Sequence, residues 1–108
     1  MQFDIDMKSE HKALFMSARK LLVEYYQLKE IKKDRITTYS DDKSGICHMR
    51  TMPHGIDIGF LKGTCMEDKY SLLTDTGKVM RVLSMSALNI DYIKYYIDQA
   101  IKINAEKP

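Results

Sequence analysis

The sequence has no tryptophan, only two cysteines and two prolines, and no apolar run longer than a few residues. Two cysteines are too few for a fold held together by disulfides, so Cys47 and Cys65 are expected to be reduced thiols. The apolar runs are far shorter than a membrane-spanning helix. The first six residues include two acidic side chains and lack the apolar segment of a secretory signal. These absences predict a cytoplasmic protein that does not insert into a membrane.

A strong excess of one charge is also missing, because 17 basic residues face 15 acidic ones and the formal net charge is +2. A chain this balanced does not require a polyanionic partner, so no nucleic-acid binding is expected. The densest basic run, Lys29 to Lys33, is interpreted as the solvated end of a helix, where lysines interact favourably with the helix dipole. With 108 residues, 44% apolar and 30% charged, the chain has the composition of one globular domain, residues 1–108.

Apolar periodicity divides this domain into helices and strands. After Ser9, a suitable N-cap, apolar residues recur every three or four positions, which predicts an amphipathic helix. Short β-branched and apolar runs between turn residues predict strands, and Asn89 is placed to cap a second helix. The expected elements are a helix over about 9–29, strands over about 34–40, 46–52, 56–62 and 78–84, and a helix over about 89–104. Short connections favour an α+β two-layer sandwich, an antiparallel sheet of about four to five strands with both helices on one face.

Strand parity predicts which side chains lie on the sheet face that the helices leave open. The apolar alternation from Ile56 to Phe60 marks one face of the third strand as buried. A two-residue hairpin at His54-Gly55 pairs Thr51 with Ile58, and directly opposed residues share a face. The opposite parity would bury an arginine without a partner, which is unfavourable. The open face is therefore expected to carry His48, Arg50, Asp57 and Arg81, with Cys47, Met49, Met80 and Val82 in the core.

No cysteine, histidine or carboxylate pattern has the spacing of a zinc site or of a catalytic motif, so a non-enzymatic domain without an assigned metal is predicted. The segment Thr76-Gly77-Lys78 looks like the end of a phosphate loop, but the full pattern requires Gly at Leu72 and Ser or Thr at Val79. Two interpretations of this turn stay open. We favour a glycine-assisted turn with solvated basic side chains; the other is an anion site formed by backbone N–H groups and the basic side chains that follow.

Two segments carry a family resemblance. Residues 53–63, PHGIDIGFLKG, end in a GF-x-[KR]-G pattern, and residues 73–82, LTDTGKVMRV, are similar to the pattern L-x-G-T-G-K-x-M-R-H. Together with the closing helix from Asp91 to Ile101, they resemble the YdhG-like family, a domain of unknown function in most members, over about residues 10–104. The resemblance implies a frataxin-like fold and places Gly77, Lys78 and Arg81 at motif positions, with Val82 where the family often has histidine.

The sequence thus predicts a binding domain whose ligand is an anionic small molecule or a protein partner, with His48, Arg50, Gly77, Lys78 and Arg81 as the candidate ligand-binding residues. Some members of the resembled family are described as iron chaperones. That resemblance implies an alternative in which exposed carboxylates bind Fe²⁺, with Glu67, Asp68 and Asp75 as the candidates. The preferred interpretation includes no cofactor, and Fe²⁺ belongs to the alternative alone. Monomer and homodimer both stay open, because an uncovered sheet face can be a binding site or a dimer interface.

Overall fold

The computed structural model describes residues 1–75 and 77–106. It confirms the α+β class, with helices packed against an antiparallel sheet. The sheet has six strands in the order β1-β2-β3-β4-β6-β5, more than the expected four to five. The helices are α1 (Gln2–Met7), α2 (Lys12–Lys20), which continues as a π-helical turn (Leu21–Tyr25), and α3 (Ile90–Glu106). The strands are β1 (Lys29–Lys32), β2 (Thr37–Ser40), β3 (Gly45–Met52), β4 (Gly55–Phe60), β5 (Leu73–Asp75) and β6 (Arg81–Met85).

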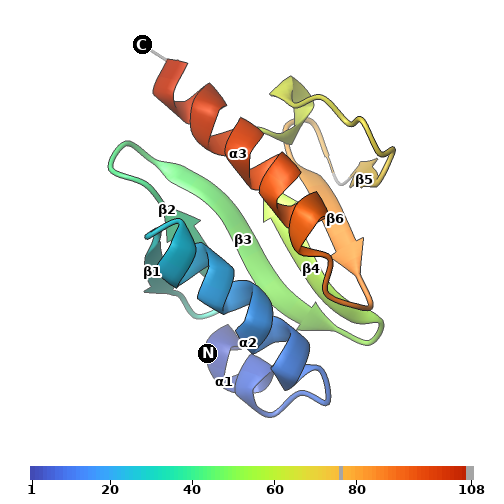
Figure 1. Cartoon of the computed structure of the whole chain (residues 1–108). Helices are drawn as coiled ribbons and strands as arrows, with labels where there is room; N and C mark the ends of the chain where they lie inside the picture. Colours follow the sequence, from blue (N-terminus) through green and yellow to red (C-terminus); the bar gives the residue numbers. More distant parts are fainter. Residues whose placement is uncertain (76, 107–108) are drawn as a thin grey trace.

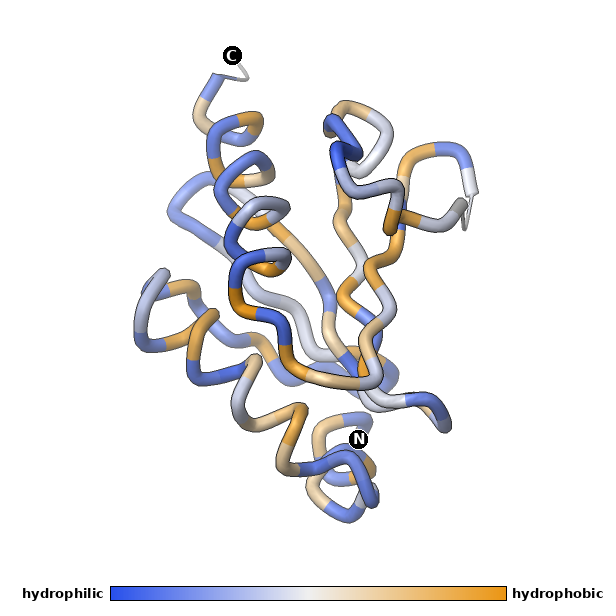
Figure 2. Tube along the Cα trace, turned by 45° about the vertical axis from the view of Figure 1, so that its right-hand side comes forward, coloured by the Kyte–Doolittle hydropathy of each residue, from blue (hydrophilic) through white to orange (hydrophobic). Residues whose placement is uncertain are grey.

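The helices lie together on one face of the sheet, where Figure 1 shows α2 and α3 crossing in front of the central strands and α1 beside the end of β3. Along α2 and α3, hydrophobic and hydrophilic residues alternate at helical spacing (Figure 2). The apolar residues of each helix turn toward the sheet and are buried there. The core contains Phe15, Ala18, Leu22, Ile93, Tyr96 and Ile97 from the helices, packed with Cys47, Met49, Ile56, Ile58 and Phe60 from β3 and β4.

The β3–β4 hairpin keeps the expected faces but not the expected pairing. Met49 opposes Ile58 and Met52 opposes Gly55, so the two-residue loop is Pro53-His54 instead of His54-Gly55. This register differs from the expected one by two residues, and a shift of two returns every side chain to the same face. Gly55 allows the tight turn because its φ is +148°. The predicted burial of Cys47 and Met49 is therefore confirmed.

The N-terminal third differs more from the expected pattern. The helix expected over about 9–29 is shorter and consists of α2 with its π-helical turn, residues 12–25. Two unexpected elements flank it, α1 before it and the edge strand β1 after it. Gln27, with a φ of +55°, adopts the left-handed conformation that ends the helix and reverses the chain. The basic run from Lys29 therefore lies mostly in the edge strand β1 and not at a helix end. Exposed lysines on an edge strand discourage association with the edge of another sheet. Glu30 anchors β1 by accepting two hydrogen bonds from Arg19, at 2.6 and 2.7 Å, and one from Tyr39, at 2.9 Å.

The last strand has the opposite parity to the predicted one. Leu83 opposes Ile58 and is buried with Met85 in the core, whereas Val82 opposes Gly59 on the open face. Leu83 and Met85, two residues apart on β6, are the apolar pair of this strand that packs against the core, in place of Met80 and Val82. Arg81 is the first residue of β6 and points to the same side of the sheet as the core. At the end of the strand its long side chain can extend away from the core. In the described part of the chain, no helix is long and apolar enough to cross a membrane.

Candidate functional site

The open face is the side of the sheet that carries no helix, and two rows of opposed residues cross it. In one row His48 of β3 opposes Gly59 of β4, which opposes Val82 of β6. In the next row Arg50 opposes Asp57, which opposes Ser84. Opposed residues share a face, so the register alone brings these side chains together. The predicted placement of His48, Arg50 and Asp57 on one face is thus what the strand register produces.

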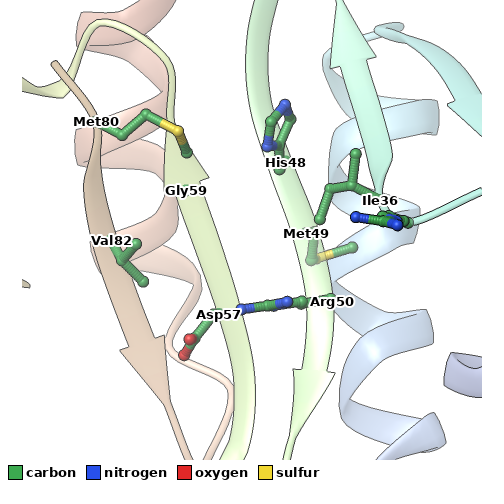
Figure 3. Close-up of a pocket in the computed structure, with 9 residues that line it drawn as sticks. Ile36, His48, Met49, Arg50, Asp57, Gly59, Met80 and Val82 are labelled. Atoms are coloured by element: carbon green, nitrogen blue, oxygen red, sulfur yellow. The ribbon is translucent and has the colours of Figure 1, made fainter. Parts of the chain in front are cut away.

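A cavity of about 370 Å³ lies over these two rows. Because Gly59 has no side chain, the methyl group of Met80 lies over its backbone at the centre of the lining. A Cβ built on Gly59 would lie only 2.9 Å from Cε of Met80 and 3.9 Å from Cγ2 of Val82. Figure 3 shows Met80 and Val82 on one side of the cavity and Ile36 on the other, with His48 and Arg50 between them. The lining residues are Arg35, Ile36, His48, Met49, Arg50, Asp57, Gly59, Met80 and Val82.

The charge in this cavity is predominantly positive. Arg35 and Arg50 are exposed, and neither makes a side-chain hydrogen bond or ion pair to another residue within 1–75 and 77–106. Asp57 is the acidic residue of the lining, but its Oδ1 already lies 2.7 Å from His54 Nε2 and accepts a hydrogen bond of 2.7 Å from Ser84 Oγ. Asp57 is therefore bound on its own side, and the guanidinium of Arg50 is left to interact with solvent or a ligand.

His48 is half-buried in the floor of the cavity. Burial lowers the pKa of its imidazole below the ordinary value, and the positive charges of Lys33 and Arg50 lower it further. The ring is therefore neutral at pH 7, so that one ring nitrogen donates a hydrogen bond and the other accepts one. Protonation at lower pH would add a third positive charge beside the two arginines.

The five predicted ligand-binding residues do not form one site. His48 and Arg50 line the cavity, but Gly77 and Lys78 lie in the exposed turn between β5 and β6, outside the lining. Arg81 is on the helix side of β6, not on the open face, and its Nη1 donates to the carbonyl oxygens of Gly77, at 3.0 Å, and Met80, at 2.7 Å. The turn is thus tied to Arg81, and the predicted Thr76 of this segment lies outside the described residues.

Sequence reasoning missed the residues that complete the cavity. Arg35 and Ile36 belong to the connection between β1 and β2, which was expected to be part of one strand. Gly59 was a usable signal, because glycine in the middle of a strand often marks a close approach or a hollow. Met80 and Val82 were assigned to the core through the reversed parity of β6.

The carboxylates named for iron are arranged differently from a metal site. Burial would raise the pKa of Asp68, but hydrogen bonds from Tyr96 and from the backbone N–H groups of Leu72 and Leu73 outweigh it and lower the pKa. Asp68 thus organises its own loop. Glu67 is exposed, and the side chain of Asp75 lies outside the described residues. Within the described residues, no group of three His, Cys, Asp or Glu side chains could hold a metal ion.

The two cysteines are separate and reduced. Cys65 is exposed, whereas Cys47 is fully buried under the helices, where burial raises the pKa of its thiol. A buried thiol with a raised pKa is a poor nucleophile. Cys47 and His48 are adjacent in sequence but point to opposite faces of β3, so they do not form a pair.

Comparison with known proteins identifies no relative: no family model, curated protein or solved structure matches the chain. What the chain does is therefore inferred from the geometry and charge of the open face.

Proposed function

We propose that this chain is a non-enzymatic binding domain whose open face binds a small organic anion, with Arg50 as the main contact to the charged group. The observation that carries the proposal is the state of Arg50. Its guanidinium is exposed beside a cavity of about 370 Å³ and has no ion-pair partner among the described residues. A guanidinium with free N–H groups is suited to bidentate recognition of a carboxylate or phosphate.

The surroundings of Arg50 favour an anion over a cation or neutral ligand. Arg35 lines the same cavity, and Lys33 lies close enough to lower the pKa of His48. The hydrogen bonds of Asp57 to His54 and Ser84 leave it less able to neutralise the arginines. A hollow of this volume is in the range of small-molecule sites, which favours a small ligand over a protein partner.

The resemblance to the YdhG-like family, with its frataxin-like arrangement of helices on one face of an antiparallel sheet, belongs to the same proposal, as does a cytoplasmic location. The observed helix–sheet layering supports that arrangement without distinguishing it from other α+β sandwiches. No arrangement of carboxylates among the described residues favours the iron-chaperone alternative. Monomer and homodimer are both compatible with an anion site on the open face.

The test is a titration of ¹⁵N-labelled protein with sodium acetate and sodium phosphate at constant ionic strength, followed by amide NMR. We expect saturable shifts concentrated at 35–36, 48–50, 57–59 and 80–82. Sodium chloride at the same ionic strength is the control and should shift exposed lysines uniformly. Absence of saturable shifts in these segments with every anion would contradict the proposed function. Shifts elsewhere that follow addition of cell extract would instead indicate a protein partner.

A further inference from the structure

Building on this anion site, we infer that its ligand is an amphipathic monocarboxylate: a carboxylate at Arg50 and Arg35, joined to a short apolar chain over Gly59. The inference rests on the proposed function, because it needs the anion site to exist. It adds that the other half of the cavity selects the body of the ligand. An inorganic anion would fill the positive end only and leave the apolar end in contact with water.

The apolar half of the cavity is built around one missing side chain. Gly59 sits between His48 and Val82 in the same cross-sheet row, so the floor there is bare backbone. The methyl group of Met80 and the side chain of Val82 stand over this floor, at 2.9 and 3.9 Å from the position of a Cβ on Gly59. Ile36 closes the opposite side (Figure 3). A thioether side chain such as Met80 is flexible and adapts its shape to an apolar ligand.

The charged and apolar halves are adjacent, and their order is fixed by the sheet. Arg50 and Asp57 form the row next to the row of His48, Gly59 and Val82. Arg50 is therefore two residues along β3 from His48, which opposes Gly59. Side chains two residues apart on one strand are separated by roughly 7 Å. At about 1.3 Å per carbon, a linear acid bound to Arg50 through its carboxylate therefore needs about five to six carbons to reach the Met80 methyl group over Gly59 and the side chain of Val82.

The experiment compares dissociation constants for acetate, butanoate and hexanoate, measured with the full chain by NMR or calorimetry below any micelle-forming concentration. Each buried methylene should tighten binding about two- to fourfold, so hexanoate should bind at least about tenfold more tightly than acetate. Amide shifts of 59 and 82 should be larger with hexanoate than with acetate. Hexylamine, which has the same chain and the opposite charge, should not saturate the site.

The matched variants are Val82→Thr in the cavity and Val79→Thr just outside its lining. Threonine has nearly the volume of valine and an equal preference for strands, but its hydroxyl opposes apolar contact. We expect Val82→Thr to weaken hexanoate binding about threefold or more and to leave acetate binding unchanged. Val79→Thr should change neither, because Val79 is 52% exposed and does not line the cavity.

Three outcomes separate the inference from the proposed function. Acetate and hexanoate binding with affinities within twofold, both at the open face, would overturn the amphipathic ligand and leave the anion site standing. Hexylamine binding as tightly as hexanoate would overturn it too, because the carboxylate would then have no part in recognition. Failure of every anion to bind at the open face would contradict the proposed function itself.

Discussion

Arg50 and Asp57 occupy directly opposed positions on β3 and β4, yet Asp57 is bound to His54 and Ser84, and the two charges do not form an ion pair among the described residues. Opposite charges at opposed positions of a sheet usually stabilise one another. Here the local hydrogen bonds hold the carboxylate on its own side of the row. The arginine is thereby left available, which is the feature that makes the open face a candidate anion site.

This relationship predicts that Asp57→Asn strengthens anion binding. Asparagine keeps an oxygen that accepts hydrogen bonds from His54 and Ser84 but removes the negative charge beside Arg50. At the separation of neighbouring side chains in a solvated site, the lost repulsion of the ligand is worth roughly 0.5–1 kcal/mol, or about threefold in the dissociation constant. Calorimetric titration with acetate at low ionic strength measures the change. Unchanged or weaker binding by a variant with a native amide spectrum would show that Asp57 does not oppose the ligand.

His48 predicts a pH dependence of binding. Burial, followed by the charges of Lys33 and Arg50, holds its pKa below the ordinary value of 6.5. A bound anion favours the protonated ring and raises this pKa, so by linkage anion affinity must increase as the pH falls from neutrality through the pKa of His48. A sulfonate, which keeps its charge at every pH used, should bind more tightly at pH 5.5 than at pH 7.5.

The control for this pH dependence is His48→Gln, which keeps a hydrogen-bonding side chain and cannot titrate. Its affinity for the sulfonate should be nearly flat between these two pH values. The stability of the free protein should change in the opposite direction. Because the folded-state pKa of His48 is lowered, the unfolded chain takes up the proton first, and stability is lost as the pH falls below about 6.5. A pKa of His48 above 6.5 in the free protein, measured from its ring proton by NMR, would contradict the expected loss of stability. Equal affinities of the parent chain for the sulfonate at the two pH values would contradict the linkage to binding.

Much of the layering could be predicted from the sequence, because apolar periodicity is strong where a segment packs on the core. The burial of Cys47 and Met49 and the placement of His48 and Arg50 on the open face follow from parity. A register error of two residues in the hairpin does not change parity. Parity failed for β6, where Met80-Arg81-Val82-Leu83 offers apolar residues on both faces. Only the partner strand decides between them, by pairing Leu83 with Ile58.

Short elements held by distant contacts could not be predicted in this way. The six residues of α1 are too few to form a stable isolated helix, and they had no apolar period to recognise. β5 has three residues and β1 is a charged edge strand, so neither carries a clear strand pattern. Arg35 reaches the cavity only because β1 exists and turns the chain back into β2. The sequence therefore predicted only the part of the cavity lining that β3 and β4 contribute.

The anchoring of α1 gives a prediction about stability. Asp6 is fully buried, and its Oδ1 accepts hydrogen bonds from Gln2 Nε2 at 2.9 Å, from the backbone N–H of Thr51 at 2.9 Å and from Thr51 Oγ1 at 2.8 Å. Asp6→Ala removes these contacts and leaves the N–H of Thr51 without its acceptor. We expect the free energy of unfolding to fall by about 2–3 kcal/mol, measured by urea denaturation, because hydrogen bonds to charged groups contribute about 1.5–3 kcal/mol.

The matched comparison is Asp6→Asn, which retains an acceptor oxygen and should have a smaller effect than alanine. Amide hydrogen exchange should accelerate over 2–7 in the alanine variant and stay slow in β4. A loss of stability below about 0.5 kcal/mol for Asp6→Ala would mean that α1 is held by its apolar contacts and not by this carboxylate.

The most direct test of the anion site compares Arg50→Ala with Lys78→Ala. Both variants remove one positive charge from an exposed position, but only Arg50 lines the cavity. If Arg50 holds the ligand, Arg50→Ala weakens hexanoate and acetate binding about tenfold or more, since a charge-assisted contact is worth about 1.5–3 kcal/mol, while Lys78→Ala stays within twofold of the parent chain. Equal losses in the two variants, or no loss in Arg50→Ala, would contradict a specific anion site on the open face.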